Sequence, residues 1–422
     1  MTNSRVLGVG AWWVLAAAAL VVLAALGYAT WWVHGQVPYR IDVDVYRMGA
    51  QAWRDGHPLY GDVLFVTRVR ETPLPFTYPP IAAVLFTPFT WVSLPVATAT
   101  LTVITTVLLV VSVALVLTAL GVGTAARRGS GPGGPAWWRS GVLAGAIVAA
   151  AIWLGAEPIL SNYGYGQINV VLMTLVIADC LPRRTPWPRG VLVGVAMAVK
   201  LTPAVFLLYF LLRRDTRAAL WAVATFATAV AAAFLLAPTD SREYWTRTLF
   251  HTNRIGDTAV NTNQNFAGVL ARLGITGGPF AMWWAAAGLA TLALTVWAVR
   301  RLLRDDQPTL ALMCVALFGL LVSPVSWSHH WVWALPTIVT LAVRGYRRSS
   351  PALAGLAVVG LVLLYWAPLR LLGDSGVGEQ LLGAAYVWWA LAVLVVAGLT
   401  AAVRAGAPQR PTAVPAPEPT PA

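Results

Sequence analysis

The stretch Met282–Val299, MWWAAAGLATLALTVWAV, carries no charged side chain from one end to the other. A helix of about 20 apolar residues crosses the hydrocarbon core of a bilayer, so this stretch predicts a transmembrane helix. A second apolar run, Ala11–Val33, is too long for a signal peptide and lacks a small-residue cleavage site before Trp31 and Trp32. Runs of this kind predict an all-α polytopic membrane protein.

The composition of the chain agrees with this class. Of its 422 residues, 58% are hydrophobic and 11% are charged, whereas soluble domains carry about a quarter charged residues. The net charge of +13 does not indicate a nucleic-acid partner, because the Lys and Arg residues cluster in short loops between apolar runs, where they set membrane orientation. Cys180 and Cys314 lie in apolar runs and are predicted to pack there, not to form a disulfide or a metal pair.

The basic loops fix the predicted orientation, because Lys and Arg favour the cytoplasmic side. This placement predicts about ten full spans plus broken helices, about 10–12 transmembrane helices in all, with both termini inside and a periplasmic first loop. The basic loops are Arg127–Arg139, Arg183–Arg189, Arg213–Arg217, Arg300–Arg304 and Arg344–Arg348. The outer loops are His34–Pro80, Pro158–Gln167, Pro238–Pro279, Ser323–His330 and Arg370–Gln380. Residues 1–404 are predicted to form one membrane domain, and residues 405–422 a disordered Pro-rich cytoplasmic tail.

Two stretches do not fit a simple alternation of spans. Pro80–Leu94 is interrupted by Pro88 and is predicted to be a short or re-entrant helix. Gly190–Leu212 begins and ends beside basic loops, which predicts two half-helices that meet at Lys200–Pro203. An alternative topology lets both stretches cross differently, and it places two basic loops outside.

Most unusual polar motifs fall on the outer side, beginning with Arg40–Arg47, RIDVDVYR. If this stretch is extended, Asp42 and Asp44 share one face. If a helix starts at Asp44, that residue caps it and Asp42 stands free. A free carboxylate at a membrane surface can act as a general base, and a pair can hold a divalent metal. The alternative is a capped amphipathic helix with salt bridges to Arg40 and Arg47.

Two outer segments are rich in aromatic and amide side chains. In Pro73–Pro80, PLPFTYPP, the prolines stiffen the entry to the next helix, and Tyr78 can stack on a sugar or anchor in headgroups. In Asn162–Asn169, NYGYGQIN, the amides of Gln167 and Asn169 can bond sugar hydroxyls, or they can cap the helix that follows.

Three further motifs carry cations or imidazoles. Lys200 lies at predicted membrane depth, where it suits a phosphate or snorkels to an interface. Asn261–Arg272 predicts a capped amphipathic helix whose Arg272 can bind a phosphate or a lipid headgroup. His329 and His330 do not share a helical face, so at most one is expected to enter a given site directly, and either can be an ordinary core histidine.

A carboxylate, amides, histidines and a buried lysine on one side suit a sugar acceptor and a phosphate-linked donor. The segments that carry these groups match a known family in its own order over Asp42–Pro336. They are IDVDVYRMGA, LPFTYPPIAAVLF, YGQINVVLM, GVLVGVAMAVKLTPA, NQNFAGVLARL and SPVSWSHHWVWALP. The chain resembles the GT-C superfamily glycosyltransferases that use polyprenyl-phosphate-mannose. Among these it is similar to the family 87 type, the actinobacterial α-(1→2)-mannosyltransferases of phosphatidylinositol mannoside and lipomannan synthesis.

The resemblance implies an inverting enzyme of the cell membrane whose active site faces the extracytoplasmic side. The donor would be polyprenyl-phosphate-mannose, and the acceptor a mannosylated glycolipid such as a phosphatidylinositol mannoside, lipomannan or lipoarabinomannan. The implied catalytic residues are Asp42, as general base, and His329. The implied donor-phosphate ligands are Lys200, His330 and Arg272. The implied sugar and acceptor residues are Asp44, Tyr46, Tyr78, Gln167, Asn169 and Gln264.

Neither a metal nor another cofactor is expected, because Asp42 and Asp44 lack a third acidic ligand nearby and the leaving phosphate carries little charge. One departure from the family concerns Asn263-Gln264-Asn265, since the family often has Asn-Gln-Ser there, and this bears on acceptor choice.

A transporter or flippase would also suit broken helices and a membrane lysine, but no internal repeat is visible. A transferase for another lipid-linked sugar, such as arabinofuranose, would keep Asp42 in its role. A non-catalytic envelope scaffold has no need of the Asp, His and Lys set.

Overall fold

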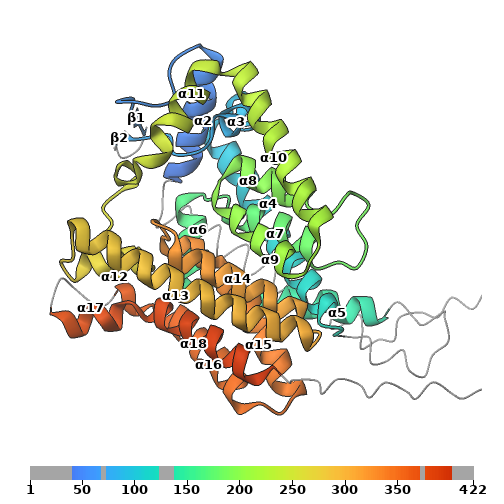
Figure 1. Cartoon of the computed structure of the whole chain (residues 1–422). Coiled ribbons are helices and arrows are strands. Elements are labelled where there is room, and N and C mark those ends of the chain that lie inside the picture. The colour runs from blue at the N-terminus through green and yellow to red at the C-terminus, as the bar shows by residue number, and fades with distance from the viewer. Residues whose placement is uncertain (1–39, 68–72, 123–136, 371–375, 402–422) are drawn as a thin grey trace, which may run out of the picture.

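The computed structural model describes residues 40–67, 73–122, 137–370 and 376–401. Within these ranges the chain is almost entirely helical (Figure 1). The helices up to the middle of the chain are α2 (Ile41–Arg54), α3 (Pro80–Leu85), η1 (Thr87–Trp91), α4 (Leu94–Ala119), α5 (Trp137–Trp153), α6 (Glu157–Tyr165), α7 (Asn169–Cys180), α8 (Val191–Val199), η3 (Thr202–Phe206) and α9 (Leu207–Leu212). Those that follow are α10 (Thr216–Leu236), α11 (Pro238–Thr246), η4 (Thr248–Phe250), η5 (Thr252–Ile255), α12 (Phe266–Arg272), α13 (Gly277–Arg304), α14 (Pro308–Val322), η6 (Ser328–Trp333), α15 (Ala334–Arg347), α16 (Pro351–Trp366), η7 (Pro368–Arg370), α17 (Val377–Gly383) and α18 (Ala385–Thr400). One short antiparallel hairpin pairs β1 (Phe65–Val66) with β2 (Pro73–Leu74).

Three of the sequence predictions concern residues outside the described ranges. They are the span Ala11–Val33, most of the basic loop Arg127–Arg139, and the tail 405–422.

Four described helices are long and apolar enough to cross a membrane: α4, α10, α13 and Pro351–Arg370, which joins α16 to η7. The bent pairs α5/α6 and α17/α18 turn by 78° and 59°, and they raise the number to six if each pair is one span. The expected number of about ten full spans is therefore too high for the described residues. Several apolar stretches form helices of 10–17 residues instead, and at 1.5 Å per residue these fall short of a full crossing.

Prolines and an extended lysine explain where the helices break. Pro158 lies in the first turn of α6, where a missing N–H is tolerated, and it prevents α5 from continuing. Lys200 ends α8 in an extended conformation, with φ −150° and ψ 125°. The predicted half-helices meeting at Lys200–Pro203 are confirmed, and so is the short broken helix in Pro80–Leu94, which divides into α3 and η1.

Helix α14 forms the centre of the bundle. Its side chains are buried on every face, as expected for a helix that is apolar all round. It contacts α13, α15, α18, η3 and η6. Helix α8 packs against α10 because Gly194 has no side chain; a Cβ there would lie 2.6 Å from the carbonyl oxygen of Ala222. These contacts hold the Lys200 break inside the bundle.

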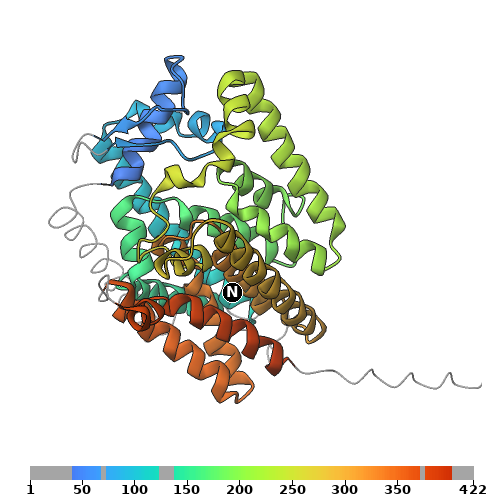
Figure 2. The same ribbon diagram turned by 60° about the vertical axis from the view of Figure 1, so that its left-hand side comes forward.

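The polar segments gather at one end of the molecule. Figure 1 shows α2, α3, α11 and the β1–β2 hairpin together at the top, and Figure 2 shows the same unit on the opposite side of the molecule from α16 and α18. Gly166, which ends α6 in a left-handed conformation with φ +72°, brings the α6–α7 turn against α2, since a Cβ there would lie 2.5 Å from Val43 Cγ2. This close approach places Asp42 next to Gln167.

The basic helix ends contact one another at the other end of the bundle. Tyr209 O–H donates to Pro308 O over 3.2 Å and so joins the end of α9 to the start of α14. The remaining contacts are Arg189 Nη1 to Cys180 O (2.8 Å), Arg213 Nη1 to Tyr209 Oη (2.9 Å), Arg348 Nη1 to Asp305 Oδ2 (2.6 Å), Arg347 Nη2 to Gly121 O (3.1 Å) and Arg301 Nη2 to Ala401 O (3.1 Å). The clusters predicted from the sequence to share one side of the membrane thus lie at one end of the molecule.

Candidate active site

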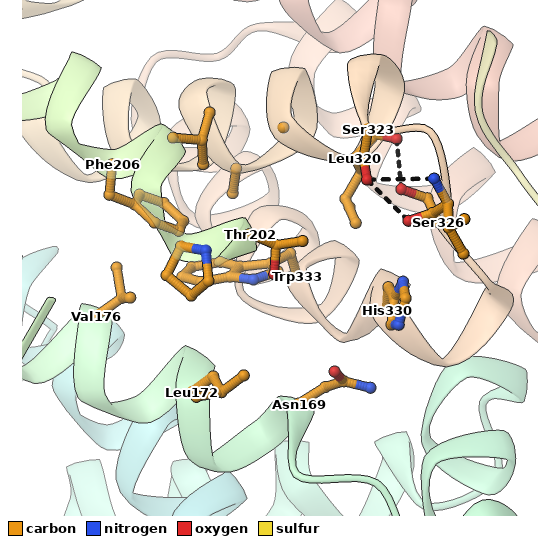
Figure 3. Close-up of a pocket in the computed structure, with 15 residues that line it drawn as sticks. Asn169, Leu172, Val176, Thr202, Phe206, Leu320, Ser323, Ser326, His330 and Trp333 are labelled. Atoms are coloured by element: carbon orange, nitrogen blue, oxygen red, sulfur yellow. Dashed lines mark hydrogen bonds between the residues drawn. The ribbon is translucent and has the colours of Figure 1, made fainter. Parts of the chain in front are cut away.

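A cavity of about 680 Å³ lies between the polar unit and the helical bundle. Its walls come from α2, the segment before α3, the α6–α7 turn, the Lys200 break, the α11–η5 segment and η6. The predicted site residues on its walls are Asp42, Tyr78, Gln167, Lys200, His329 and His330. A smaller cavity of about 60 Å³ shares His330, Thr202 and Ser323 with it and extends toward Phe206 and Trp333 (Figure 3).

Asp42 lies in the first turn of α2 and faces the large cavity. Its Oδ2 accepts a hydrogen bond of 2.7 Å from Gln167 Nε2. None of the described residues donates a hydrogen bond to Oδ1. One carboxylate oxygen is therefore held in place, and the other is open to whatever enters the cavity.

Two buried tyrosines extend this contact into a chain of hydrogen bonds. Tyr78 O–H donates to Gln167 Oε1 over 3.2 Å, and the hydroxyl oxygens of Tyr46 and Tyr78 lie 2.8 Å apart. Since a carboxylate only accepts, the amide nitrogen of Gln167 must face Asp42, and its oxygen must face the tyrosines. Proton donation thus runs from Tyr46 to Tyr78 to Gln167 to Asp42, and bonds in such a chain polarise one another.

The environment of Asp42 suits the role of a general base. Burial raises the pKa of Asp42 to about 6, and the Gln167 hydrogen bond and the Lys200 charge oppose that rise. A carboxyl group with a pKa near neutrality can accept a proton from an alcohol more readily than an ordinary carboxylate, while it still ionises at neutral pH.

Replacing Gln167 by Met should move the acid limb of the pH–rate profile to higher pH. If Asp42 is the base, it must be ionised, and activity should rise with pH through its pKa of about 6. Met removes the N–H donor that favours the ionised form, so the pKa of Asp42 rises further. We expect the variant to lose more activity at pH 6 than at pH 8, measured as kcat/KM from initial rates. If the acid limb of the pH–rate profile stays where it is in wild type, the pKa of Asp42 does not determine that limb.

Lys200 forms the second polar centre on the cavity wall. Its Nζ donates to Asn169 Oδ1 over 3.2 Å and lies 3.3 Å from His330 Nε2. It also lies over the Tyr78 ring, 5.4 Å from the ring centroid. Asn169 Nδ2 in turn donates to His329 O over 3.0 Å, and Figure 3 shows Asn169 facing His330 across the small cavity. Asn169 thus links the lysine to the histidine segment and does not cap α7.

Both histidines line the large cavity, which corrects the expectation that at most one enters the site. They belong to η6, a short 3₁₀ segment with a kink at Trp331, so the spacing of an α-helix does not apply. Their ring centroids lie 4.7 Å apart, and His329 also packs 5.1 Å from Tyr165. Neither ring nitrogen of the buried His329 has a hydrogen-bond partner among the described residues.

Asp44 does not share the face of Asp42. Helix α2 begins at Ile41, so neither the extended nor the capping interpretation of this stretch holds. Two residues along an α-helix point in nearly opposite directions, and Asp44 is 2% exposed and lies outside the cavity lining. Tyr46 is likewise fully buried and lies outside the cavity lining, where its hydroxyl contacts Gln167 Oε1 over 3.4 Å.

The described residues gather no group of three His, Cys, Asp or Glu side chains at which a metal could bind.

The amides of Asn263-Gln264-Asn265 are fully buried away from the cavity and hold the loop that leads to the histidines. Asn263 Oδ1 accepts from Ser326 N over 2.9 Å, and Asn265 Nδ2 donates to Ser323 O over 2.7 Å. Gln264 Nε2 donates to Asn261 O and Gly383 O. Its amide N–H groups are thus bonded to backbone carbonyls, whereas its Oε1 has no partner among the described residues, and the predicted sugar contact by Gln264 stays a prediction.

Arg272 also lies outside the cavity lining. Its guanidinium donates to Val260 O and Asn263 O, at 3.3 Å and 3.1 Å, and so closes the loop before α12. The guanidinium therefore lies away from the cavity, while its Nη2 has no hydrogen-bond partner among the described residues, and the expected phosphate contact stays a prediction. The expected capped helix is confirmed, because Asn265 Oδ1 accepts from Gly268 N over 2.6 Å at the start of α12.

Replacing Asn265 by Ser should leave acceptor choice unchanged. Serine is also a good N-cap, so its hydroxyl can keep the hydrogen bond from Gly268 N. The variant loses the hydrogen bond from the Asn265 amide to Ser323 O, which affects only the loop. Asn265→Ala loses the cap as well and should be less stable than Asn265→Ser by about 1 kcal/mol. Thermal unfolding in detergent and acceptor profiles of both variants test this. Equal stabilities, or a changed acceptor profile in the serine variant, would contradict it.

Arg254 on η5 is the charged cavity residue that the sequence analysis missed. It lies in a loop with no apolar periodicity and no recognised motif, so only the fold brings it to the site.

Most of the chain aligns with mannosyltransferases of actinobacteria. The polyprenol-phosphate-mannose-dependent α-(1-2)-phosphatidylinositol mannoside mannosyltransferase of Mycobacterium tuberculosis is 55% identical over 398 residues, which cover 93% of this chain and 92% of that protein. The protein of the same name from Mycolicibacterium smegmatis is 54% identical over 91% of this chain and 89% of its own length. A polyprenol-phosphate-mannose-dependent α-(1-2)-phosphatidylinositol pentamannoside mannosyltransferase of Mycobacterium tuberculosis is 35% identical over 85% of this chain and 79% of its own.

No solved structure matches the chain. The model of glycosyltransferase family 87 matches residues 76–324, a range that includes Tyr78, Gln167, Lys200 and the Asn263–Asn265 motif. With this match and with relatives that align over nearly its full length, the chain belongs to glycosyltransferase family 87.

Proposed function

We propose that this membrane protein is a polyprenol-phosphate-mannose-dependent α-(1→2)-mannosyltransferase that acts on phosphatidylinositol mannosides. The observation that carries the proposal is the pairing of two centres in one cavity: a carboxylate with a free oxygen, Asp42, and a cationic centre formed by Lys200 and His330. The relatives that align over nearly the whole chain bear this activity in their names.

The reaction assigned to this cavity is a single inverting displacement. Asp42 Oδ1 takes the proton of the acceptor mannose hydroxyl as that oxygen bonds to the anomeric carbon of the donor. The bond from the anomeric carbon to the phosphate oxygen breaks, and its electron pair leaves with polyprenyl phosphate. Gln167 keeps Asp42 oriented, so that its second oxygen points into the cavity. General base catalysis of this kind contributes roughly 10²–10⁴-fold.

The leaving phosphate is assigned to the wall formed by Lys200 and the two histidines. Lys200 has two hydrogen-bond partners among the described residues, Asn169 and His330, and so keeps one of its three N–H donors for a ligand. His329 presents ring nitrogens without partners. Fixed donors aimed at developing charge, in a site that excludes water, stabilise the transition state more than the same groups would in water.

The distribution of charge supports an extracytoplasmic active site. The basic helix ends lie together at one end of the bundle, and Lys and Arg favour the cytoplasmic face. The cavity is built from the segments at the opposite end. A lipid-linked donor on the outer leaflet could reach it.

The test is transfer of labelled mannose from polyprenyl-phosphate-mannose to a phosphatidylinositol mannoside in vesicles with the purified protein. The proposal expects a longer glycolipid whose new terminal mannose is removed by an α-(1→2)-specific mannosidase. Label that crosses the vesicle membrane without a new glycosidic bond would favour a transporter instead. Transfer of arabinose but not of mannose would identify a related transferase with another donor.

A further inference from the structure

The charges on the cavity wall do not balance. Among the described residues that line it, Asp42 is the one acid, whereas Lys200 and Arg254 are both cations. A donor phosphodiester brings one negative charge, so the cavity with donor bound is neutral only if both cations are counted.

Arg254 lies on the α11–η5 segment of the wall. Its guanidinium lies 5.9 Å from the centroid of the Tyr60 ring, and its Nη2 donates to Phe76 O over 3.3 Å. No carboxylate in the described ranges lies within ion-pair distance of it, and its other N–H groups have no described acceptor. The aromatic stack and the single backbone bond orient a planar cation that still has donors for a ligand.

The transfer reaction moves charge across the cavity. Before transfer, Asp42 carries one negative charge and the phosphodiester carries one. Afterwards Asp42 is protonated and neutral, and the polyprenyl phosphate is a monoester with two negative charges when fully ionised. The sum is unchanged, but both negative charges now reside on the phosphate. Lys200 neutralises one of these negative charges. The second negative charge requires another cation on the cavity wall.

We propose that Arg254 binds the polyprenyl phosphate as it leaves, with a contact that strengthens as the phosphate gains its second negative charge. The proposal rests on the function proposed above and names the leaving-group site more completely. Lys200 is a point charge already tied to Asn169 and His330. Arg254 adds a planar fork that can bond two phosphate oxygens at once.

The experiment compares Arg254→Gln and Arg254→Lys with wild type. Arg247→Gln is the matched control, because Arg247 lies on the same segment with a side chain that is 75% exposed and outside the cavity lining. Steady-state transfer gives kcat, the KM values for donor and acceptor, and the inhibition constant of added polyprenyl phosphate. We expect Arg254→Gln to lower kcat by about 10²-fold. It should weaken inhibition by polyprenyl phosphate at least about tenfold, and more than it raises the donor KM. Arg254→Lys should recover part of both losses, and Arg247→Gln should match wild type.

Three results would overturn the proposal. The first is a rise in the acceptor KM alone with unchanged product inhibition, which would assign Arg254 to the phosphodiester of the acceptor lipid. The second is an equal fall in stability and activity that lysine does not rescue, which would make Arg254 a packing residue on Tyr60. The third is unchanged kinetics in all variants.

A binding readout separates this proposal from the proposed function. Polyprenyl phosphate should protect the wild-type protein against thermal unfolding, and the protection should be weaker in Arg254→Gln. Protection that is equal in both proteins would overturn the Arg254 site even if mannose transfer is observed. Protection that is lost in the variant would support the site even if the transferred sugar is not mannose.

Discussion

Replacing Asp42 by Asn should lower kcat by about 10²–10⁴-fold and leave the fold intact. Asparagine has nearly the shape of aspartate, and its amide oxygen can still accept the hydrogen bond that Gln167 Nε2 now gives to Oδ2. It cannot accept the proton of the acceptor hydroxyl, however, so the nucleophile is not activated as the glycosidic bond forms. The loss should appear in the transfer of labelled mannose at saturating donor and acceptor.

Asp55→Asn is the matched control for this variant. Asp55 follows the last residue of the same helix and is exposed, and its carboxylate accepts hydrogen bonds only from Gln51 Nε2 in the described chain. It should transfer mannose at the wild-type rate. If Asp42→Asn retains full activity at equal expression, Asp42 is not the base, and another acceptor on the cavity wall must take the proton.

The convergence of Asp42, Gln167 and Lys200 was predictable, because each stands out from its surroundings in the sequence. A carboxylate, an amide and an ammonium group are costly beside a membrane unless they have partners. The break at Lys200 followed from a proline three residues later in a stretch flanked by basic loops. Sequence spacing alone left the direction of Asp42 open, because it did not say where α2 begins.

What the sequence could not show has a common physical cause: the chemistry of a side chain does not reveal which group it bonds to in the fold. Gln264 and Arg272 carry groups suited to sugar and phosphate, but backbone carbonyls of neighbouring loops bond them first. The sequence likewise did not show that Asp44 is buried, because the residue at which α2 begins decides which face of the helix it lies on. Arg254 was missed because a loop without periodicity gives no signal until η5 is folded against Tyr60. The number of spans was too high for the described residues, because apolar composition does not fix where a helix stops.

Replacing Lys200 by Met should lower kcat by at least about 10²-fold, the usual cost of losing one fixed donor at a developing negative charge. Methionine keeps an apolar stem of similar length but provides neither the charge nor the bond to Asn169 Oδ1. Because the Lys200 charge opposes the rise in the pKa of Asp42, the acid limb of the pH–rate profile should also move to higher pH. Arg217→Met, at the start of α10 at the other end of the bundle, is the control and should change neither quantity.

The stability of Lys200→Met distinguishes a functional lysine from a structural one. A half-buried ammonium group without a carboxylate within ion-pair distance in the described chain costs folding free energy. If the lysine is kept for the donor phosphate, removing it should leave the ligand-free protein as stable as wild type or more so, while polyprenyl phosphate loses its protective effect. If Lys200→Met instead unfolds at a clearly lower temperature and the remaining folded protein transfers mannose normally, the lysine serves the packing of the broken helix. The anion site would then have to be sought elsewhere on the wall.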